Sequence, residues 1–203
     1  MADASLNPSD SQACEVCSGI PSDLWANTGR GETLAPELGR LVGLGIDQSD
    51  DLYKCPGCGV LFEWQDLPQN YGSGNCDEER LTRLNAEQVL TARALLAPDP
   101  GERDGEQLLT LAFQILSHDI VYNILRYTAV RHKQAFSGFV RPLVARLMAQ
   151  SHGGLFGVIS SYCDSNRERL TEVVCLLNAG GSDISKSAQY LRTTCIERLE
   201  RAN

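Results

Sequence analysis

Two short cysteine pairs carry the clearest chemistry in the sequence. Two residues separate Cys14 from Cys17 and Cys55 from Cys58, and the second pair lies in the run Cys-Pro-Gly-Cys-Gly. This spacing lets both sulfurs of a pair reach one metal ion, and two such pairs complete the four-sulfur set that tetrahedral zinc takes. We therefore predict a zinc ion bound by Cys14, Cys17, Cys55 and Cys58.

Four thiolate ligands would close the coordination sphere of the metal, so the predicted zinc is structural rather than catalytic. A redox Cys-x-x-Cys motif is one competing interpretation, but neither pair lies in the βαβ setting that such motifs use. Chance pairing is the other. The segment between Cys17 and Cys55 is also longer than the roughly 15–20 residues of a minimal zinc ribbon.

The other cysteines have weaker signals. Cys76 precedes a predicted helix, where it is a loop thiol without a role, a thiolate stabilised by the helix N-terminus, or a substitute ligand for the first pair. Cys163, Cys175 and Cys195 fall in helical stretches beside apolar neighbours. Because free cysteine behaves as a small buried hydrophobe, we expect these three in the core.

No catalytic or cofactor-binding motif emerges elsewhere. The histidines His118, His132 and His152 share no metal-ligand spacing, and the glycine-rich segments 29–32 and 72–74 lack the lysine and hydroxyl of a phosphate loop. His118 and Asp119 form either an acid/base pair or a helix-capping junction, and His152 is expected to end a helix. An enzyme with a site assembled from dispersed residues stays an alternative.

A β-hairpin is the element that must position the second cysteine pair. Residues 52–54 lead into the pair and residues 60–65 leave it, with Val60, Phe62 and Trp64 alternating onto one sheet face. A short helix is expected at 35–42, with Pro36 near its start. Residues 67–76 have the composition of a loop, a helix is expected from Asp77 onward, and no strand pattern follows residue 66.

The remainder of the chain has helical patterning. Asn85 and Gln88 have the spacing of a capping box, residues 97–105 have linker composition, and Asp104 is expected to cap the next helix. Further helices are predicted at 119–133, 139–151, 155–163, 166–179 and 184–201. Short links between helices indicate antiparallel neighbours, as in a bundle or stacked helical hairpins.

The predicted fold class is therefore α+β. A zinc-ribbon-like domain with a β-hairpin occupies residues 13–85 after a flexible tail at 1–12, and an all-α domain of bundled or stacked helical hairpins occupies residues 86–203. Composition agrees with a globular protein, since 42% of residues are hydrophobic and 22% are charged.

The run from Leu52 to Trp64 resembles the knuckle of the zinc-ribbon superfamily, with residues 13–19 as a possible partner knuckle. Together with the loop and charged segment that follow, it is similar to poorly characterised bacterial proteins in which a ribbon-like segment precedes a helical, sometimes HEAT-like, region. The resemblance covers residues 13–85 and implies zinc binding. Proteins of this kind include candidate immunity proteins of toxin systems.

The net charge of −8 bears on possible partners. Nucleic-acid binding depends on Lys and Arg neutralising phosphates, and an acidic chain opposes that encounter while favouring a basic protein partner. The one basic concentration consists of Arg126, Arg131, His132, Lys133, Arg141 and Arg146. We expect a non-enzymatic, cytoplasmic protein-binding module, with an immunity-type inhibitor of a basic toxin as one form of it. A nucleic-acid-associated regulator is the alternative, and no membrane segment is expected.

Overall fold

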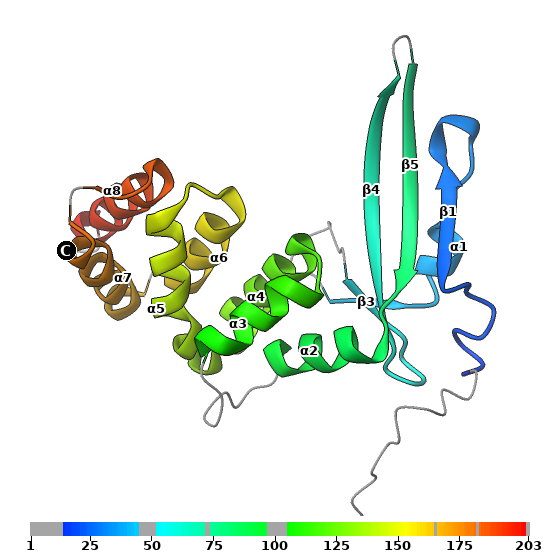
Figure 1. The fold of residues 1–203 in the computed structure, drawn as a ribbon, viewed down its shortest axis with the longest axis horizontal. Helices are drawn as coiled ribbons and strands as arrows, with labels where there is room; N and C mark the ends of the chain where they lie inside the picture. The colour runs from blue at the N-terminus through cyan, green and yellow to red at the C-terminus, as the bar shows by residue number, and fades with distance from the viewer. Residues whose placement is uncertain are drawn as a thin grey trace, which may run out of the picture. The chain divides into compact units, whose positions relative to one another are not determined.

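The computed structural model describes residues 14–44, 52–71, 74–96, 105–164, 166–181 and 183–201, with the backbone alone at 68–71 and 74–77. The chain divides into two compact units, residues 1–90 and 91–203 (Figure 1). The α+β class is confirmed, because an antiparallel sheet is followed by helices. The predicted tail at 1–12, the Asp104 cap and most of the predicted linker lie outside the described residues.

Five antiparallel strands form the sheet of the first unit. They are β1 (Asp23–Asn27), β2 (Val42–Gly43), β3 (Leu52–Lys54), β4 (Leu61–Tyr71) and β5 (Gly74–Arg83), in the order β1-β5-β4-β3-β2. The predicted hairpin around the second cysteine pair is confirmed, since Tyr53 of β3 faces Phe62 of β4. A 3-10 turn, η1 (Thr28–Arg30), and a short helix, α1 (Ala35–Leu38), connect β1 to β2.

Strand β5 corrects three predictions from the sequence. Residues 67–71 and 74–76 are strand and not loop, the segment from Asp77 is not a helix, and a strand does follow residue 66, because β4 and β5 pair from Phe62↔Arg83 to Tyr71↔Gly74. The segment lacks an apolar period because several of its polar side chains form hydrogen bonds with residues outside their own strand. Arg80 donates to Asp23 of β1 at 2.8 Å, and Glu79 accepts from the Leu34 backbone at 2.9 Å.

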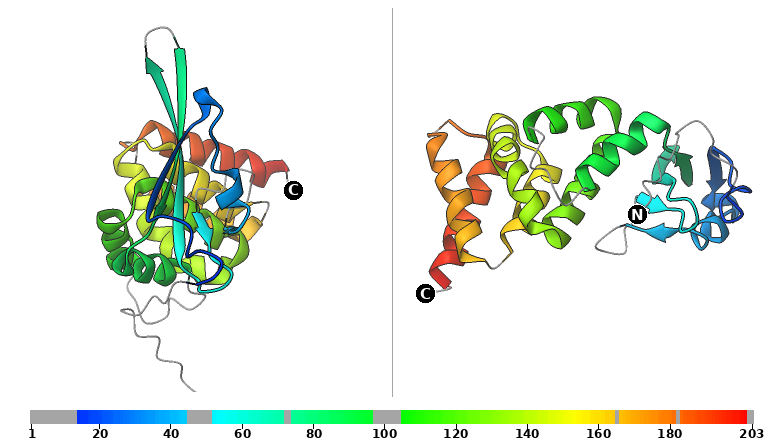
Figure 2. Two further views of the ribbon diagram at one scale, coloured as in Figure 1. Left: turned by 90° about the vertical axis from the view of Figure 1, so that its right-hand side faces the viewer. Right: turned by 90° about the horizontal axis from the view of Figure 1, so that it is seen from below.

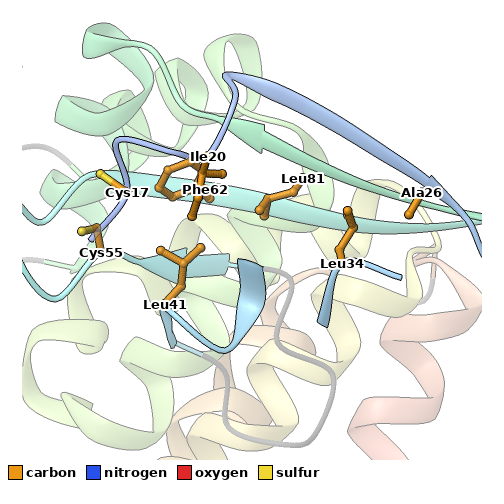
Figure 3. Packing of buried hydrophobic residues seen from close by; sticks show 8 residues of the cluster. All are labelled: Cys17, Ile20, Ala26, Leu34, Leu41, Cys55, Phe62 and Leu81. Carbon is orange, nitrogen blue, oxygen red and sulfur yellow. The ribbon is translucent and has the colours of Figure 1, made fainter. Parts of the chain in front are cut away.

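One face of the sheet carries the core of the first unit. Eight buried residues pack together there, as Figure 3 shows: Cys17, Ile20, Ala26, Leu34, Leu41, Cys55, Phe62 and Leu81. Val60 and Trp64 pack against this cluster, as the alternation in β4 predicts. Two of the cysteines, Cys17 and Cys55, thus lie at one end of the apolar core and pack with the residues of the sheet.

Helix α2 (Ala86–Leu96) begins at the predicted capping box. The Asn85 side chain accepts from the Gln88 backbone at 2.9 Å, and the Gln88 side chain accepts from the Asn85 backbone at the same distance. This reciprocal bonding satisfies two of the amide groups that a helix start leaves unpaired. The division between the two units falls within α2.

Six further helices follow in the second unit: α3 (Gly105–Ile115), α4 (His118–Arg131), α5 (Lys133–Ala149), α6 (Gly153–Cys163), α7 (Arg167–Ala179) and α8 (Lys186–Arg201). Each buries one apolar face. Helix α4 packs against α6, and α7 packs against α8 (Figure 2). These boundaries agree closely with the predicted helices, apart from the start of α5.

Helix α5 begins at Lys133 and continues through Ser137 and Gly138, where the sequence predicts a break between helices at 119–133 and 139–151. It also contains Pro142. Pro142 cannot donate to the carbonyl of Gly138 four residues earlier. The Ser137 hydroxyl donates to the Gln134 carbonyl at 2.7 Å, so the serine bonds within the helix instead of ending it. Packing of seven buried side chains along α5 outweighs the local weakness of these residues.

Candidate metal centre

The four predicted cysteine ligands lie on two backbone knuckles. In the first knuckle, the Cys17 and Ser18 amides donate to the Cys14 carbonyl at 3.0 and 2.7 Å. In the second, the Gly59 amide donates to the Cys55 carbonyl at 2.9 Å, and Gly59 has a φ of 73°, which glycine adopts without strain. The second knuckle connects β3 to β4, so the sheet fixes its position.

The structure brings all four sulfurs together. The ligand atoms of Cys14, Cys17, Cys55 and Cys58 lie within 4.8 Å of one another. The Cys14–Cys55 sulfur distance is 3.7 Å and the Cys17–Cys58 distance is 3.5 Å. Metal–sulfur bonds of about 2.3 Å in a tetrahedron place sulfurs about 3.8 Å apart, whereas a disulfide needs about 2.05 Å. The cluster therefore fits a metal ion and consists of free thiols.

Gly57 allows the two knuckles to approach. A Cβ atom at this position would lie 2.5 Å from the Cys14 sulfur and 3.3 Å from a methyl group of Val16. Only a residue without a side chain fits between the second knuckle and the first. The Pro-Gly dipeptide between Cys55 and Cys58 is thus matched to the metal site as well as to the turn.

The thiols differ in their readiness to ionise. Burial alone would raise the pKa of Cys55, but the backbone amides of Cys58 and Gly57 bond its sulfur, and its pKa falls to about 7. Burial raises the pKa of Cys58 to about 12 and also raises that of Cys17, with the neighbouring thiols contributing. In the metal-free cluster, the lowered pKa of Cys55 favours its thiolate form, whereas Cys58 and Cys17 hold protons that a metal must displace.

Arg83 is a functional candidate that the sequence did not indicate. Its Nη2 atom lies 3.4 Å from the Cys17 sulfur, although 66 positions separate the two residues. Strand β5 carries it to the knuckle, and β5 itself was not predicted. The approach of Gly57 to Cys14 has no sequence signal either, because it depends on how the two knuckles meet.

The remaining cysteines belong to other elements. Cys76 lies in β5, opposite Gln69, and not before a helix as predicted. Cys163 and Cys195 are buried, as expected, but Cys175 is exposed, so its assignment to the core is wrong. The buried positions of α7 are Leu170, Val173 and Leu177, and Cys175 lies two residues from Val173, on the opposite side of the helix.

The three histidines occupy helix ends. His118 is the first residue of α4, at the predicted junction, and Ser117 provides the cap. His132 follows α4, with its ring 5.8 Å from that of Tyr127. His152 begins α6 instead of ending a helix, because its Nδ1 atom accepts from the Gly154 amide at 3.1 Å.

The predicted basic concentration lies on α4 and α5 and at the junction between them, and Lys133 and Arg146 have local partners. Lys133 pairs with Asp164 at 3.6 Å. Arg146 donates to the Thr110 hydroxyl at 2.8 Å and stacks over the ring of Phe113. These contacts hold two of the cations in the packing of the helical unit.

Comparison with known proteins provides no further assignment. No family model matches the chain, and neither a curated protein nor a solved structure does. Among the described helices, none is both long enough and apolar enough to cross a membrane. The four-cysteine cluster and the net charge of the chain are therefore the features that bear on function.

Proposed function

We propose that this chain is a non-enzymatic protein-binding module whose first unit is stabilised by a structural zinc ion. The observation that carries the proposal is the approach of four cysteine sulfurs to within 4.8 Å of one another. Four thiolates around one zinc leave no coordination position for water or substrate. The metal would then contribute folding free energy, because an unfolded chain has no preformed site for it.

Zinc is favoured over other metals by the chemistry of the ligands. Four thiolates in a tetrahedral arrangement suit zinc or iron. The paired two-residue spacing on two knuckles is typical of structural zinc sites, and it also underlies the resemblance to zinc ribbons. Iron bound by four thiolates absorbs visible light and zinc does not, so a colourless metal-loaded protein distinguishes the two.

The proposed partner is a basic protein. The net charge of −8 attracts cations over distances near the Debye length and speeds their encounter with the chain. An immunity-type inhibitor that covers a basic toxin in the cytoplasm is one form of this function. The net charge supports a basic protein as the partner. The resemblance of residues 13–85 to bacterial proteins that include candidate immunity proteins supports the inhibitor function.

The nucleic-acid alternative needs a continuous basic surface. Lys133 pairs with the Asp164 carboxylate, which offsets part of the charge that the predicted basic concentration presents, and Arg146 is held by the neutral Thr110 hydroxyl. Phosphate contacts supply most of the affinity of nucleic-acid binding, so loss of available cations weakens this alternative.

A salt titration of the full chain tests the proposal. The metal-loaded protein is titrated with a short DNA duplex, an RNA hairpin and a set of small basic proteins, from low to physiological ionic strength. We expect salt-sensitive binding to a basic protein and none to either nucleic acid. The reverse pattern would establish the alternative. Cys55→Ser, which removes one ligand, should lose binding to a partner that needs the folded first unit.

A further inference from the structure

We infer that Arg83 is a positioning residue of the metal centre, which donates a hydrogen bond to the Cys17 sulfur and offsets part of the negative charge of the four thiolates. The inference rests on the proposed zinc site.

The Arg83 side chain is held at both its base and its head. Its backbone amide donates to the Ser22 carbonyl at 2.8 Å, which fixes the end of β5 beside β1. Its guanidinium lies over the ring of Phe62, the residue opposite it on β4, at 5.5 Å from the ring centre. Phe62 is fully buried, so this stacking surface is rigid.

The Arg83 guanidinium contacts the cysteine cluster through one of its nitrogens. Nη2 contacts the Cys17 sulfur at 3.4 Å, while Nε is buried and has no hydrogen-bond partner among the described residues. Burial of an N–H group without a hydrogen-bond partner is unfavourable. A side chain kept in this position despite that cost is consistent with a compensating interaction at the sulfur.

Electrostatics explains what that interaction would provide. Zinc with four thiolates carries two excess negative charges, and a cation at hydrogen-bond distance from one sulfur stabilises the charged form of the site. Groups that bond metal ligands typically change metal affinity by about 10- to 100-fold. Because Arg83 bonds Cys17, its removal should free that sulfur first when the metal is extracted.

Arg40 provides a matched control. It is the other arginine at the first knuckle, and its Nη2 atom donates to the Glu15 carbonyl at 3.4 Å, between the two cysteines and not to a sulfur. Arg40→Met and Arg83→Met change the net charge equally and keep an unbranched stem. Arg83→Lys retains the positive charge without the planar fork.

The experiment measures zinc affinity by competition with a chromophoric chelator, together with the sulfur-to-metal charge-transfer band of the cobalt-substituted full chain. We expect Arg83→Met to bind zinc about 10- to 100-fold more weakly and to shift the cobalt band to longer wavelength. Arg83→Lys should recover part of both changes, and Arg40→Met should match the wild type.

The outcomes separate this inference from the proposed zinc site. If Arg83→Met and Arg40→Met have equal affinities and bands, the role of Arg83 is wrong while the zinc site stands. If the wild-type chain itself binds neither zinc nor cobalt through its thiols, the zinc site is wrong. Should Arg83→Met not fold, Arg83→Gln, which removes the charge and keeps a polar head, replaces it in the same comparison.

Discussion

At the scale of single residues, Gly57 has the tightest fit in the metal centre. A side chain at this position would meet the Cys14 sulfur at 2.5 Å, closer than real Cβ contacts. We predict that Gly57→Ala displaces Cys14 and weakens zinc binding by at least about tenfold, as other changes that reorient ligands do. Chelator competition measures the effect.

Gly19→Ala is the control for this substitution. Gly19 follows the first knuckle, and a Cβ there would make an ordinary contact of 3.5 Å with the Arg40 side chain. This variant should retain wild-type affinity. Equal affinities for Gly57→Ala and the wild type would show that the knuckles do not approach as described.

The ionisation of the thiols predicts the pH dependence of metal binding. The pKa of Cys58 is raised to about 12 and that of Cys17 is also raised, so both hold protons near neutral pH in the metal-free protein. Zinc must displace these protons, so its apparent affinity falls as pH falls, by roughly tenfold per pH unit for each proton released. Competition between about pH 7 and about pH 8 measures the slope, and a flat profile would contradict it.

At the scale of elements, the turn between α6 and α7 stores backbone strain. Asp164 has a φ of 44°, the one positive φ among the described non-glycine residues. Its carboxylate pairs with Lys133, and its carbonyl accepts from Arg198 at 3.4 Å. These contacts from α5 and α8 hold a conformation that costs about 1–3 kcal/mol for a residue with a side chain.

We predict that Asp164→Gly is more stable than Asp164→Ala by about 1 kcal/mol or more. Both variants lose the pair with Lys133, so the comparison isolates the backbone. Glycine normally destabilises relative to alanine, and the positive φ reverses that order. Denaturant unfolding followed by far-UV circular dichroism gives the difference, and an alanine variant at least as stable as the glycine variant would refute the strain.

Strand β5 is the part of the fold that could not be predicted from the sequence. The β3–β4 hairpin was predicted because Val60, Phe62 and Trp64 alternate, and the capping box of α2 was predicted because Asn85 and Gln88 act locally. Strand β5 has no such signal, since residues such as Arg80 find their partners on another strand. Long-range pairing of polar side chains leaves no periodic pattern in the sequence.

The same distinction applies to the candidate site. The four cysteines were identified because ligand spacing within each pair is local. Arg83 was missed because its contact with Cys17 depends on the register of β5, and the fit of Gly57 against Cys14 depends on how the two knuckles meet. In α5, burial of an extended apolar face outweighs the Ser137-Gly138 signal that predicted a later start.

At the scale of the whole molecule, the two units should respond differently to metal removal. The cysteines Cys17 and Cys55 belong to the core cluster of the first unit, whereas the helices of the second unit have their own buried faces. We predict that a chelator unfolds the first unit and leaves most of the helical signal intact. The prediction would be wrong if the chelator unfolded both units together or if it unfolded neither.

The two tryptophans of the chain make this prediction measurable, because Trp25 lies in β1 and Trp64 in β4. Their fluorescence reports on the first unit alone. Far-UV circular dichroism reports mainly on the helices of the second unit. Addition of zinc after chelation should restore the fluorescence.

Whether Cys14, Cys17, Cys55 and Cys58 hold one zinc ion is decided by elemental analysis of the full chain, purified without an affinity tag. We expect one equivalent of zinc per chain, retained on gel filtration and lost together with stability of the first unit in Cys55→Ser. A stable, folded protein that contains no metal would show that the four cysteines are not a zinc site.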